Sequence, residues 1–463
     1  MSETVYDIVI IGAGPAGYVA GIRAAQLGLS ACVIEKDKAG GVCLNIGCIP
    51  SKALIHQAEV FASYKDLQAM GVKVDLSGLD YSQVFKKSRT AADTLSNGVN
   101  FLLKKNKVPL IAGEAKISGK GEVTLKDGTK VRGKNILVAT GSSPKNISGF
   151  EFDEKLVISS TGALMLEKLP KRVFILGGGA IGCEFAHVFN AFGTEVVIAE
   201  MLDHLLPLED AETVAILERA FVKRGIKVHT STKATGMKRT KNGAVVSIEG
   251  KDGKKQDIEV DQVLVVVGRG PNTDGIGLES VGIKTERGFI PVGDYYETSA
   301  KGVFAVGDVT SSPLLAHVAS KEAEIAVEHI AGHNPPKRID PMAIPGAVYC
   351  EPQVASFGLN EEQAKKEGIS FKKASFPYRG AGKSVAVEKS EGMVKVLFDP
   401  KTREILGAHI VGADATELIH ELLLAKSSEL LPEDIATMIH AHPTLSEAVM
   451  ESMRAAEGWA IHI

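Results

Sequence analysis

The chain has 463 residues and a formal net charge of −3, from 53 Lys and Arg against 56 Asp and Glu. This length predicts about three domains, and the balanced charge gives no support for a nucleic-acid or membrane-surface partner. Five cysteines are an odd number for a secreted disulfide scaffold. The polar start of the chain lacks the pattern of a signal or transit peptide, and no apolar run approaches the ~20 residues of a membrane span. We therefore expect a protein of the reducing cytoplasm.

The first predicted element is a strand at residues 6–11, followed by a loop that contains Gly12, Gly14 and Gly17. An Ala-rich helix and a second strand ending in Glu35 come next. In a dinucleotide site the first glycine permits a tight turn, the second lets pyrophosphate approach the backbone, and the third packs the helix on the strand. The helix N-terminus holds the phosphates, and the acid accepts hydrogen bonds from ribose hydroxyls. The pattern therefore predicts a dinucleotide site.

Two cysteines, Cys43 and Cys48, follow this unit, and Ser51 is predicted to cap a helix that begins behind them. A thiol near a helix N-terminus has its thiolate stabilised by the helix dipole. Such a pair can cycle between dithiol and disulfide. Two alternatives stay open at this point: two buried inert cysteines, or half of a zinc site, although no companion Cys-x-x-Cys or His pair completes one. The spacing alone favours redox function about as much as the alternatives.

The dinucleotide pattern returns in the middle of the chain. A strand at residues 171–176 leads into Gly177, Gly179 and Gly182, then a helix, then a strand that ends at Glu200. One such loop is a weak signal, but two copies with strand, helix and acid indicate two bound dinucleotides, and hence two different cofactors. Glu200 favours NAD over NADP, because a 2′-phosphate would meet a carboxylate there.

Three further strands each run into a glycine, at residues 136–142, 263–269 and 302–308. The simplest interpretation is one dinucleotide domain that is interrupted by a second and then resumes. The sequence pattern changes near Pro341. After this point a hairpin around Asp399-Pro400 and helices at 415–428 and 445–456 are predicted. The expected fold class is α/β, with two nested Rossmann-like domains and a C-terminal α+β domain. We place the domains, with the third range as the return of the first, at residues 1–143, 144–273, 274–341 and 342–463.

The tail carries His442 and, five residues later, Glu447 at the start of a predicted helix. An imidazole, with an ordinary pKa of about 6.5, can take a thiol proton at neutral pH, and a carboxylate can fix its tautomer. The alternative is a solvent-exposed His at a helix start, which the tail alone favours two to one. His440 lies close by, but no third ligand has a recognisable spacing, so no metal site is predicted. Cys32 and Cys183 are expected to be packing residues.

Taken in this order, the motifs resemble those of the flavin disulfide oxidoreductases, and within them the branch that oxidises dihydrolipoamide. The resemblance covers essentially the whole chain. Its marks are the two glycine loops with their acids, residues 40–52, residues 139–142, Gly307-Asp308, Ala316-His317 and residues 442–447.

The resemblance implies FAD in the first site, NAD in the second, and a redox disulfide between Cys43 and Cys48. Cys43 would be the interchange thiol that meets the substrate, and Cys48 the sulfur nearer the flavin. His442 and Glu447 would form an acid/base pair that serves the disulfide of the other subunit. The protein would then be an obligate homodimer with the C-terminal domain as its interface.

The resemblance also assigns cofactor contacts residue by residue. Lys52 would pair with Glu184 near the reactive edge of the flavin, Asp308 would bind the ribityl chain, and the backbone of residues 315–317 would lie near the pyrimidine end of the ring. The expected FAD contacts are Gly12, Gly14, Gly17, Glu35, Lys52, Ala115, Thr140, Gly141, Ser142, Asp308, Leu315, Ala316 and His317. The expected NAD contacts are Gly177, Gly179, Ile181, Gly182, Glu184, Glu200, Ala234 and Gly268.

The implied reaction is oxidation of protein-bound dihydrolipoyl groups to lipoamide with reduction of NAD. The implied partners are the lipoyl-bearing proteins of 2-oxo-acid dehydrogenase complexes or of glycine cleavage. A glutathione-reductase-like activity is disfavoured by Glu200 and Ser51, and a mercuric-reductase-like one by the absence of a C-terminal cysteine pair. A flavin- and NAD-binding sensor or scaffold would need neither the cysteine pair nor the His–Glu tail. Val42, Gly270 and Val318 depart from the family pattern, and they affect local flavin and nucleotide contacts.

Overall fold

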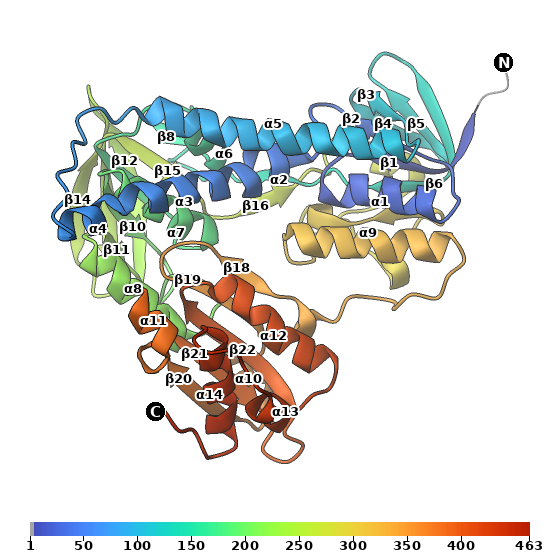
Figure 1. The fold of residues 1–463 in the computed structure, drawn as a ribbon. Helices are drawn as coiled ribbons and strands as arrows, with labels where there is room; N and C mark the ends of the chain where they lie inside the picture. Colours follow the sequence, from blue (N-terminus) through green and yellow to red (C-terminus); the bar gives the residue numbers. More distant parts are fainter. Residues whose placement is uncertain (1–3) are drawn as a thin grey trace.

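The computed structural model describes residues 4–463, and Figure 1 shows them in three parts. Residues 1–3, with which the first predicted domain begins, lie outside the described residues. Each of the two α/β parts is built on a sheet whose central strands are parallel and also holds antiparallel strands. The C-terminal part, in orange and red, holds an antiparallel sheet. The predicted class, two nested dinucleotide-binding domains followed by an α+β domain, is confirmed. The domain boundaries at 143, 273 and 341 stay a prediction.

Buried apolar residues place the first strand in the middle of its sheet. β1 (Val5–Ile11) pairs in parallel with β2 (Ala31–Glu35) on one side and with β6 (Lys130–Val138) on the other. Beyond β6 lies β17 (Val303–Ala305), which the chain reaches only after it has built the second α/β part. This return of the chain is the nesting that the strand-to-glycine junctions predict.

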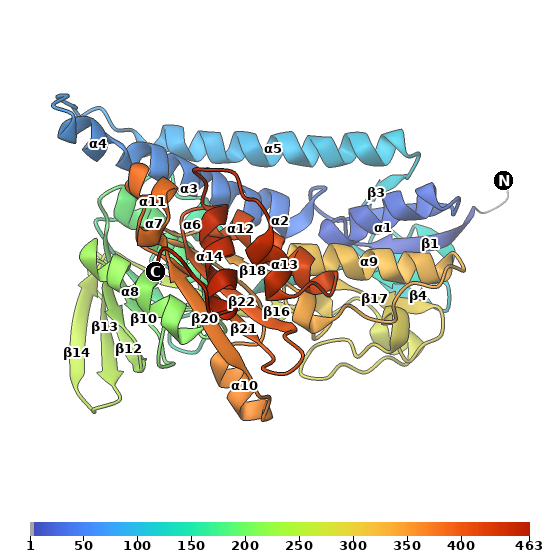
Figure 2. The same cartoon turned by 60° about the horizontal axis from the view of Figure 1, so that its bottom comes forward.

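Helices cover the first sheet and connect it to the second part. The other elements of the first part are α1 (Pro15–Gln26), α2 (Gly41–Ile46), α3 (Cys48–Ala62), α4 (Tyr64–Ala69), α5 (Tyr81–Lys105), β3 (Leu110–Ala112), β4 (Ala115–Gly119), β5 (Glu122–Leu125), η1 (Leu278–Val281), η2 (Asp294–Tyr296), η3 (Gly307–Val309) and α9 (Ala316–Ile330). α1 packs against α9, while the long α5 runs along one side of the molecule and contacts α1, α2 and α3 (Figures 1 and 2).

The helix behind the cysteine pair begins earlier than predicted. α3 starts at Cys48, and Gly47 occupies the N-cap position that the sequence predicts for Ser51. Ser51 lies inside the first turn, where its Oγ donates to the carbonyl oxygen of Gly47 at 2.7 Å. The prediction for Ser51 is wrong because its hydroxyl satisfies a backbone carbonyl instead of accepting from a helix N–H. As a result, Cys48 itself is the first residue of the helix.

The second part repeats the plan of the first. β9 (Arg172–Leu176) lies between β10 (Glu195–Ala199) and β15 (Gln262–Val265), and all three are parallel. The other elements of this part are β7 (Ser142–Pro144), β8 (Val157–Ile158), α6 (Ser160–Leu164), α7 (Ala180–Ala191), α8 (Ala211–Lys223), β11 (Lys227–His229), β12 (Thr232–Arg239), β13 (Ala244–Gly250), β14 (Lys255–Val260) and β16 (Arg269–Pro271). The loop after β9 enters α7 as the loop after β1 enters α1, so the two predicted glycine loops occupy equivalent places.

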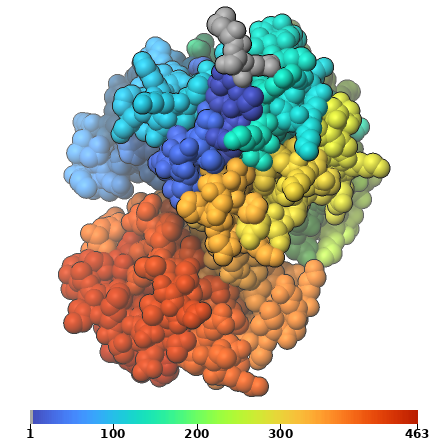
Figure 3. Space-filling view, turned by 90° about the vertical axis from the view of Figure 1, so that its right-hand side faces the viewer, coloured from blue at the N-terminus to red at the C-terminus, as the bar shows by residue number. Residues whose placement is uncertain are grey.

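The C-terminal part is an antiparallel sheet with helices, and it forms its own lobe in Figure 3. The predicted hairpin is present, since its two strands pair in an antiparallel register. The elements are η4 (Pro341–Ala343), β18 (Gly346–Val348), β19 (Gln353–Gly358), α10 (Glu361–Glu367), β20 (Lys372–Pro377), η5 (Tyr378–Gly380), α11 (Gly382–Ala386), β21 (Met393–Phe398), β22 (Ile405–Gly412), α12 (Ala415–Ser427), α13 (Pro432–Thr437) and α14 (Ser446–Ala456). Within residues 4–463, helices long and apolar enough to cross a membrane are absent.

A buried cluster of charges joins the C-terminal part to the second part. The side chain of Lys395 in β21 is only 1% exposed, and its Nζ lies 2.9 Å from Asp210, 2.8 Å from Glu212 and 2.6 Å from Glu361. Asp210 is also the N-cap of α8, where its carboxylate accepts from the backbone N–H of Glu212 and Thr213. Because a buried ammonium requires carboxylate partners, this cluster fixes α8 against β21.

Candidate active site

Cys43 and Cys48 are separated by the break between two consecutive helices. Cys43 lies in α2, and Cys48 is the first residue of α3. Both cysteines carry free thiols, and the Cys43 thiol donates a hydrogen bond to the sulfur of Cys48. This bond lowers the pKa of the Cys48 thiol to about 7; burial opposes the shift, and the Lys52 ammonium adds to it. The same bond, together with burial, raises the pKa of Cys43, so Cys48 is the more acidic thiol of the pair.

Glycines bring the cysteine segment onto the first glycine loop. Gly41 has a φ of +55°, and a Cβ on it would stand 2.7 Å from the Cα of Gly14. Gly47 forms the turn between the two helices, where a Cβ would meet the carbonyl oxygen of Val42 at 2.8 Å. A larger residue at either position would therefore displace the thiol pair from the loop.

Two side chains of α5 hold the segment that carries the thiols, and sequence reasoning missed both of them. The Oγ of Ser96 donates to the carbonyl oxygen of Ala39 at 2.7 Å, just before α2 begins. At the other end of α2, Arg89 donates from Nη1 to the carbonyl oxygen of Asn45 at 2.7 Å. Both residues lie more than forty positions away from the cysteines, so no local motif signals them.

Lys52 and Glu184 connect the first part to the second, as the resemblance implies. Lys52 lies in α3, and its Nζ donates to both carboxylate oxygens of Glu184 in α7, at 2.9 and 3.0 Å. The side chain of Lys52 is 33% exposed and that of Glu184 10% exposed. Lys52 follows Cys48 by four residues in α3, and this spacing puts both side chains on one helix face.

The first glycine loop has the geometry of a phosphate cradle. A Cβ on Gly12 would meet the carbonyl oxygen of Ala139 at 2.3 Å, and one on Gly17 would meet that of Gly12 at 1.8 Å. A Cβ on Gly14, in contrast, would stand in open space, with no atom of residues 4–463 within 4 Å apart from its chain neighbours. The first and third glycines are therefore required for packing, and the second leaves the backbone open to a ligand, which fits a dinucleotide.

The second glycine loop repeats these relations position by position. A Cβ on Gly177 would meet the carbonyl oxygen of Val266 at 2.6 Å, and one on Gly182 would meet that of Gly177 at 2.1 Å. A Cβ on Gly179 would again find open space in the described part of the chain. This loop therefore also fits a dinucleotide, which would lie at the N-terminus of α7.

The acid at the end of each second strand is bound to its own glycine loop. Glu35 accepts from the N–H of Ala13, and Glu200 accepts from the N–H of Gly178, both at 2.7 Å. Each carboxylate also accepts at 2.9 Å from the N–H two residues further along the chain. Because a carboxylate has about four acceptor sites, each acid keeps capacity for ribose hydroxyls.

Four other predicted contacts lie close to these loops. Ala115 begins β4, two residues after Gly113, whose N–H donates to the Glu35 carbonyl oxygen at 2.8 Å. In the same way Ala234 in β12 lies two residues after Thr232, whose N–H donates to the carbonyl of Glu200 at 2.9 Å. The other two contacts are in the second part, one early in α7 and one in the loop after β15, and are Ile181 and Gly268.

Asp308 belongs to a polar group that links both α/β parts. The Oγ of Ser142 donates to the Asp308 carboxylate, and Arg269 donates from Nε to the same Oγ at 2.7 Å. The neighbouring Thr140 donates from Oγ1 to the carbonyl oxygen of Asn272 at 2.7 Å, and Gly141 lies between Thr140 and Ser142. Arg269 is a member of this group that sequence reasoning missed.

The residues expected at the pyrimidine end of the flavin form the start of α9. Leu315 takes the N-cap position, Ala316 is the first helical residue, and His317 the second. No side chain of the described residues caps this helix, so its first backbone N–H groups stay available to a ligand. The Nε2 of His317 lies 2.9 Å from the carbonyl oxygen of Pro345 and must carry the proton of that bond.

His442 and Glu447 form the predicted pair, but in one chain they stand apart from the thiols. The Nδ1 of His442 lies 2.8 Å from a Glu447 oxygen, and the N–H of Thr444 donates to the other oxygen at 2.9 Å. Although partial burial pushes the other way, these bonds lower the pKa of Glu447. The His442 side chain is 75% exposed, and Figure 1 separates α14, which carries Glu447, from α2.

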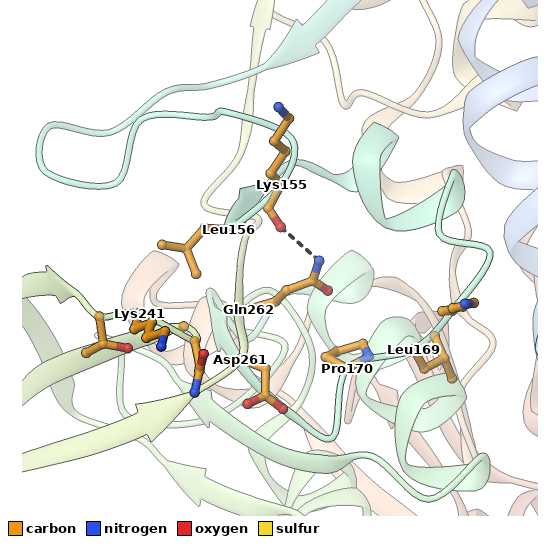
Figure 4. Close-up of a pocket in the computed structure, with 11 residues that line it drawn as sticks. Lys155, Leu156, Leu169, Pro170, Lys241, Asp261 and Gln262 are labelled. Carbon is orange, nitrogen blue, oxygen red and sulfur yellow. Dashed lines mark hydrogen bonds between the residues drawn. The ribbon is translucent and has the colours of Figure 1, made fainter.

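Two open hollows lie on the second part, away from the cysteine helices. One of about 420 Å³ is framed by Lys155, Lys241 and Asp261, and there Gln262 donates from Nε2 to the Lys155 carbonyl oxygen at 2.9 Å (Figure 4). No predicted site residue lines it. The other, of about 510 Å³, is lined by Met201 and by residues of β12 and β13, next to Glu200.

The remaining cysteines and His440 take no part in the thiol site. Cys32, Cys183 and Cys350 are buried, and burial raises the pKa of all three thiols. The Nε2 of His440 lies 2.8 Å from Glu421, and residues 4–463 contain no cluster of three or more His, Cys, Asp or Glu side chains placed to hold a metal ion. The family departures at Val42, Gly270 and Val318 fall in α2, β16 and α9, respectively.

Comparison with protein families decides the relationship. The family described as pyridine nucleotide-disulphide oxidoreductase matches residues 6–323, and the dimerisation domain of the same family matches residues 344–453. The chain belongs to this family. Membership in the pyridine nucleotide-disulphide oxidoreductases, together with the two cradles above, confirms FAD and NAD as the cofactors.

Several relatives of this oxidoreductase match over nearly the whole length of both chains. The chain is 44% identical to a dihydrolipoyl dehydrogenase of Chlorobaculum tepidum, over 96% of each chain. It is 41% identical to one of Bacillus subtilis and 40% identical to one of Rhizobium etli, over 99% of each chain. Among solved structures, LpdA of Mycobacterium tuberculosis superposes with a TM-score of 0.88 at 28% identity, covering 97% of this chain and 99% of that one. The HOCl-induced flavoprotein disulfide reductase RclA of Escherichia coli gives 0.86 at 26% identity, with the same coverage.

Proposed function

We propose that the chain oxidises dihydrolipoamide to lipoamide and reduces NAD. The observation that carries this proposal is the Cys43–Cys48 pair, with Cys48 at the N-terminus of α3 and beside the Lys52 ammonium. It occurs in a chain whose relatives at 40–44% identity are named dihydrolipoyl dehydrogenase. A thiol pair of this kind exchanges with a dithiol substrate without any other nucleophile.

The thiols carry the first half of the reaction. Starting from a Cys43–Cys48 disulfide, a substrate thiolate attacks the sulfur of Cys43, which forms a mixed disulfide and breaks the Cys43–Cys48 bond. Cys48 leaves as a thiolate, and the lowered pKa of this thiol makes it a good leaving group. The second substrate thiol, once deprotonated, attacks the substrate sulfur of the mixed disulfide, which closes the lipoamide ring, breaks the bond to Cys43 and releases Cys43 as a thiolate. Two electrons then reside in the enzyme dithiol.

The chemistry that bound FAD and NAD supply is transfer of these two electrons to the nicotinamide. The residues of the chain bind and orient the two groups. The first loop, with Glu35 and Asp308, would hold FAD, and the second loop, with Glu200, would hold NAD. Lys52 and Glu184 join the two parts at the thiol pair.

The base in this proposal is His442 of the partner subunit. Since Nδ1 of His442 is bound to Glu447, that nitrogen carries the proton and Nε2 is left to accept one from a substrate thiol. The exposed position of His442 and the separation of the following helix, α14, from α2 within one chain (Figure 1) support a site shared between subunits. A homodimer is further supported by the dimerisation domain at residues 344–453.

Lipoyl groups would reach Cys43 on a partner protein, from 2-oxo-acid dehydrogenase complexes or glycine cleavage. Five free cysteines agree with a reducing cytoplasm.

The test is the rate of NADH formation by the purified, flavin-loaded protein with dihydrolipoamide and NAD, with NADP in parallel. We expect turnover with NAD and little with NADP, because Glu200 disfavours a 2′-phosphate. Cys32→Ala, which alters a buried thiol in β2, serves as a matched control and should keep the rate. Absence of turnover with NAD would contradict the proposal.

A further inference from the structure

Tyr349 contacts both members of the Lys52–Glu184 ion pair. Its backbone N–H donates to the Oε1 of Glu184 at 3.2 Å. Its ring lies beneath the Lys52 ammonium, with Nζ 4.3 Å from the ring centroid, within the range of a cation–π interaction. Tyr349 comes from the C-terminal part, directly after β18, so three separate parts of the chain meet at this ammonium.

The backbone around Tyr349 is fixed by its neighbours. Val348 and Cys350, on either side of it, are buried in one apolar cluster. The same cluster contains residues close in sequence to Lys52 and Glu184. They are Leu54 and Ile55 from α3, and Cys183 and Phe185 from α7. Because a close-packed core of this kind does not adjust freely, the ring has a fixed place under the ammonium.

The ion pair alone would hold Lys52 weakly. Its side chain is 33% exposed, and exposed ion pairs contribute little because long side chains lose entropy and water screens the charges. Glu184 accepts from Nζ on one side, and the Tyr349 ring supplies a second attractive surface. The ammonium is thus held between a carboxylate and an aromatic face.

The position of Lys52 matters for the thiol pair, because Lys52 and Cys48 share one face of α3. The charged and titratable groups that act on Cys48 come from every surrounding element: Cys43 from α2, Lys52 from α3, Glu184 from α7, Arg269 from β16 and Tyr349 after β18. Two of these groups, Lys52 and Arg269, are cations that favour a Cys48 thiolate, and Tyr349 is the aromatic side chain that contacts the Lys52 ammonium.

We infer that Tyr349 is a positioning residue whose ring fixes the Lys52 ammonium between Glu184 and the thiol pair. This role rests on the proposed function, because in that reaction Cys48 is the thiolate that leaves Cys43 and then donates electrons. It is a role of the aromatic ring, and the hydroxyl is not required.

The test measures the pH dependence of the reaction of iodoacetamide with Cys48 in the full-length, reduced, flavin-loaded protein. Cys43→Ser removes the competing thiol but keeps a hydroxyl donor, and peptide mass spectrometry distinguishes Cys48 from the buried cysteines. In this background, Tyr349→Leu removes the ring but keeps the backbone N–H that donates to Glu184. Tyr349→Met is a second ringless variant, used if the Tyr349→Leu protein does not fold. Tyr349→Phe is the matched control, since it keeps the ring.

We expect Tyr349→Leu and Tyr349→Met to shift the half-point of the alkylation profile upward by about half a pH unit, which means about threefold less thiolate at low pH. Tyr349→Phe should leave the profile unchanged, and Lys52→Met should shift it at least as far as Tyr349→Leu does. Superimposable profiles for the ringless variants and the Cys43→Ser parent would overturn the inference, and so would an equal shift in Tyr349→Phe. Because this readout needs no turnover, it separates failure of the inference from failure of the proposed function, which would show as no NADH formation by the unmodified chain.

Discussion

The two glycine loops of this chain are built alike and serve different surroundings. In both, the first and third glycines lie against backbone carbonyls, the second faces open space, and an acid bonds the loop from the end of the second strand. The first loop is covered by the cysteine segment, because Gly41 packs on Gly14 and the N–H of Gly40 donates to the carbonyl of Ala13. Its sheet also receives β17, which delivers Asp308.

The second loop is covered by a segment of a different kind. The N–H of Leu206 donates to the carbonyl of Gly178 at 2.8 Å, and a Cβ on Gly178 would meet the side chain of Leu205 at 2.5 Å. After Glu200 the chain turns outward, and the side chains of Met201 and Leu202 are exposed beside an open hollow. The difference teaches that the same phosphate cradle suits two tasks. The segment over the first cradle carries the two thiols and would place a cofactor held there next to them, whereas the segment over the second cradle brings two buried apolar side chains, Leu205 and Leu206. Variants that affect only one of the two regions test this comparison.

The largest effect is expected from Cys48→Ser, which breaks electron flow in the first region. Dihydrolipoamide turnover should fall on the order of 10³-fold or more, because no disulfide can form with Cys43. The second region should be unaffected, so NADH should still reduce an artificial electron acceptor through the flavin. Steady-state assays of both reactions check the prediction, and near-normal lipoamide turnover would contradict it.

A smaller effect is expected from His442→Gln, which removes the proposed base and leaves both cradles intact. Thiol oxidation should slow by about 10²–10³-fold, with flavin content and NADH oxidation by an artificial acceptor unchanged. Glu447→Gln should have a weaker effect of the same kind, since it disturbs only the partner of Nδ1. An unaltered rate in His442→Gln would remove this residue from the mechanism.

Two matched glycine variants separate the loops directly. Gly182→Ala places a Cβ 2.1 Å from the carbonyl of Gly177, and Gly17→Ala places one 1.8 Å from that of Gly12. Overpacking of this kind costs about 1–3 kcal/mol, so Gly182→Ala should raise the KM for NAD by about ten- to a hundredfold and spare the flavin. Gly17→Ala should instead lower the flavin content of the purified protein. The comparison fails if both variants affect the same cofactor.

The smallest effect is expected at the acids. Glu200→Gln should raise the KM for NAD about tenfold, because hydrogen bonds to a charged acceptor contribute about 1.5–3 kcal/mol and part of this is lost. Glu35→Gln should weaken flavin binding and leave the KM for NAD as it is. Asp203→Asn, a nearby charge outside the loop, is the control for Glu200, and an equal change in it would show that general charge and not the loop contact is responsible.

Much of this architecture could be predicted because its signals are local. The strand-loop-helix pattern around Gly12 and Gly177 and the hairpin of β21 and β22 depend on residues close together in the chain. Ser51 shows the limit, since the choice between two N-cap positions four residues apart depends on a hydroxyl that donates back to Gly47. Arg89, Ser96 and Tyr349 could not be found in this way, because they reach the site from α5 and from the segment after β18. The spacing of residues along the chain does not predict such long-range contacts.

The central claim is that dihydrolipoamide passes its electrons through a Cys43–Cys48 disulfide, and peptide mapping with thiol labelling tests it most directly. In the oxidised holoenzyme we predict a peptide that links Cys43 to Cys48, with neither residue alkylated. After one equivalent of dihydrolipoamide without NAD, both should be alkylated, and the three buried cysteines should stay unlabelled in the native protein. The account is contradicted if Cys43 and Cys48 are already alkylated in the oxidised enzyme, or if dihydrolipoamide reduces the enzyme while their disulfide stays closed.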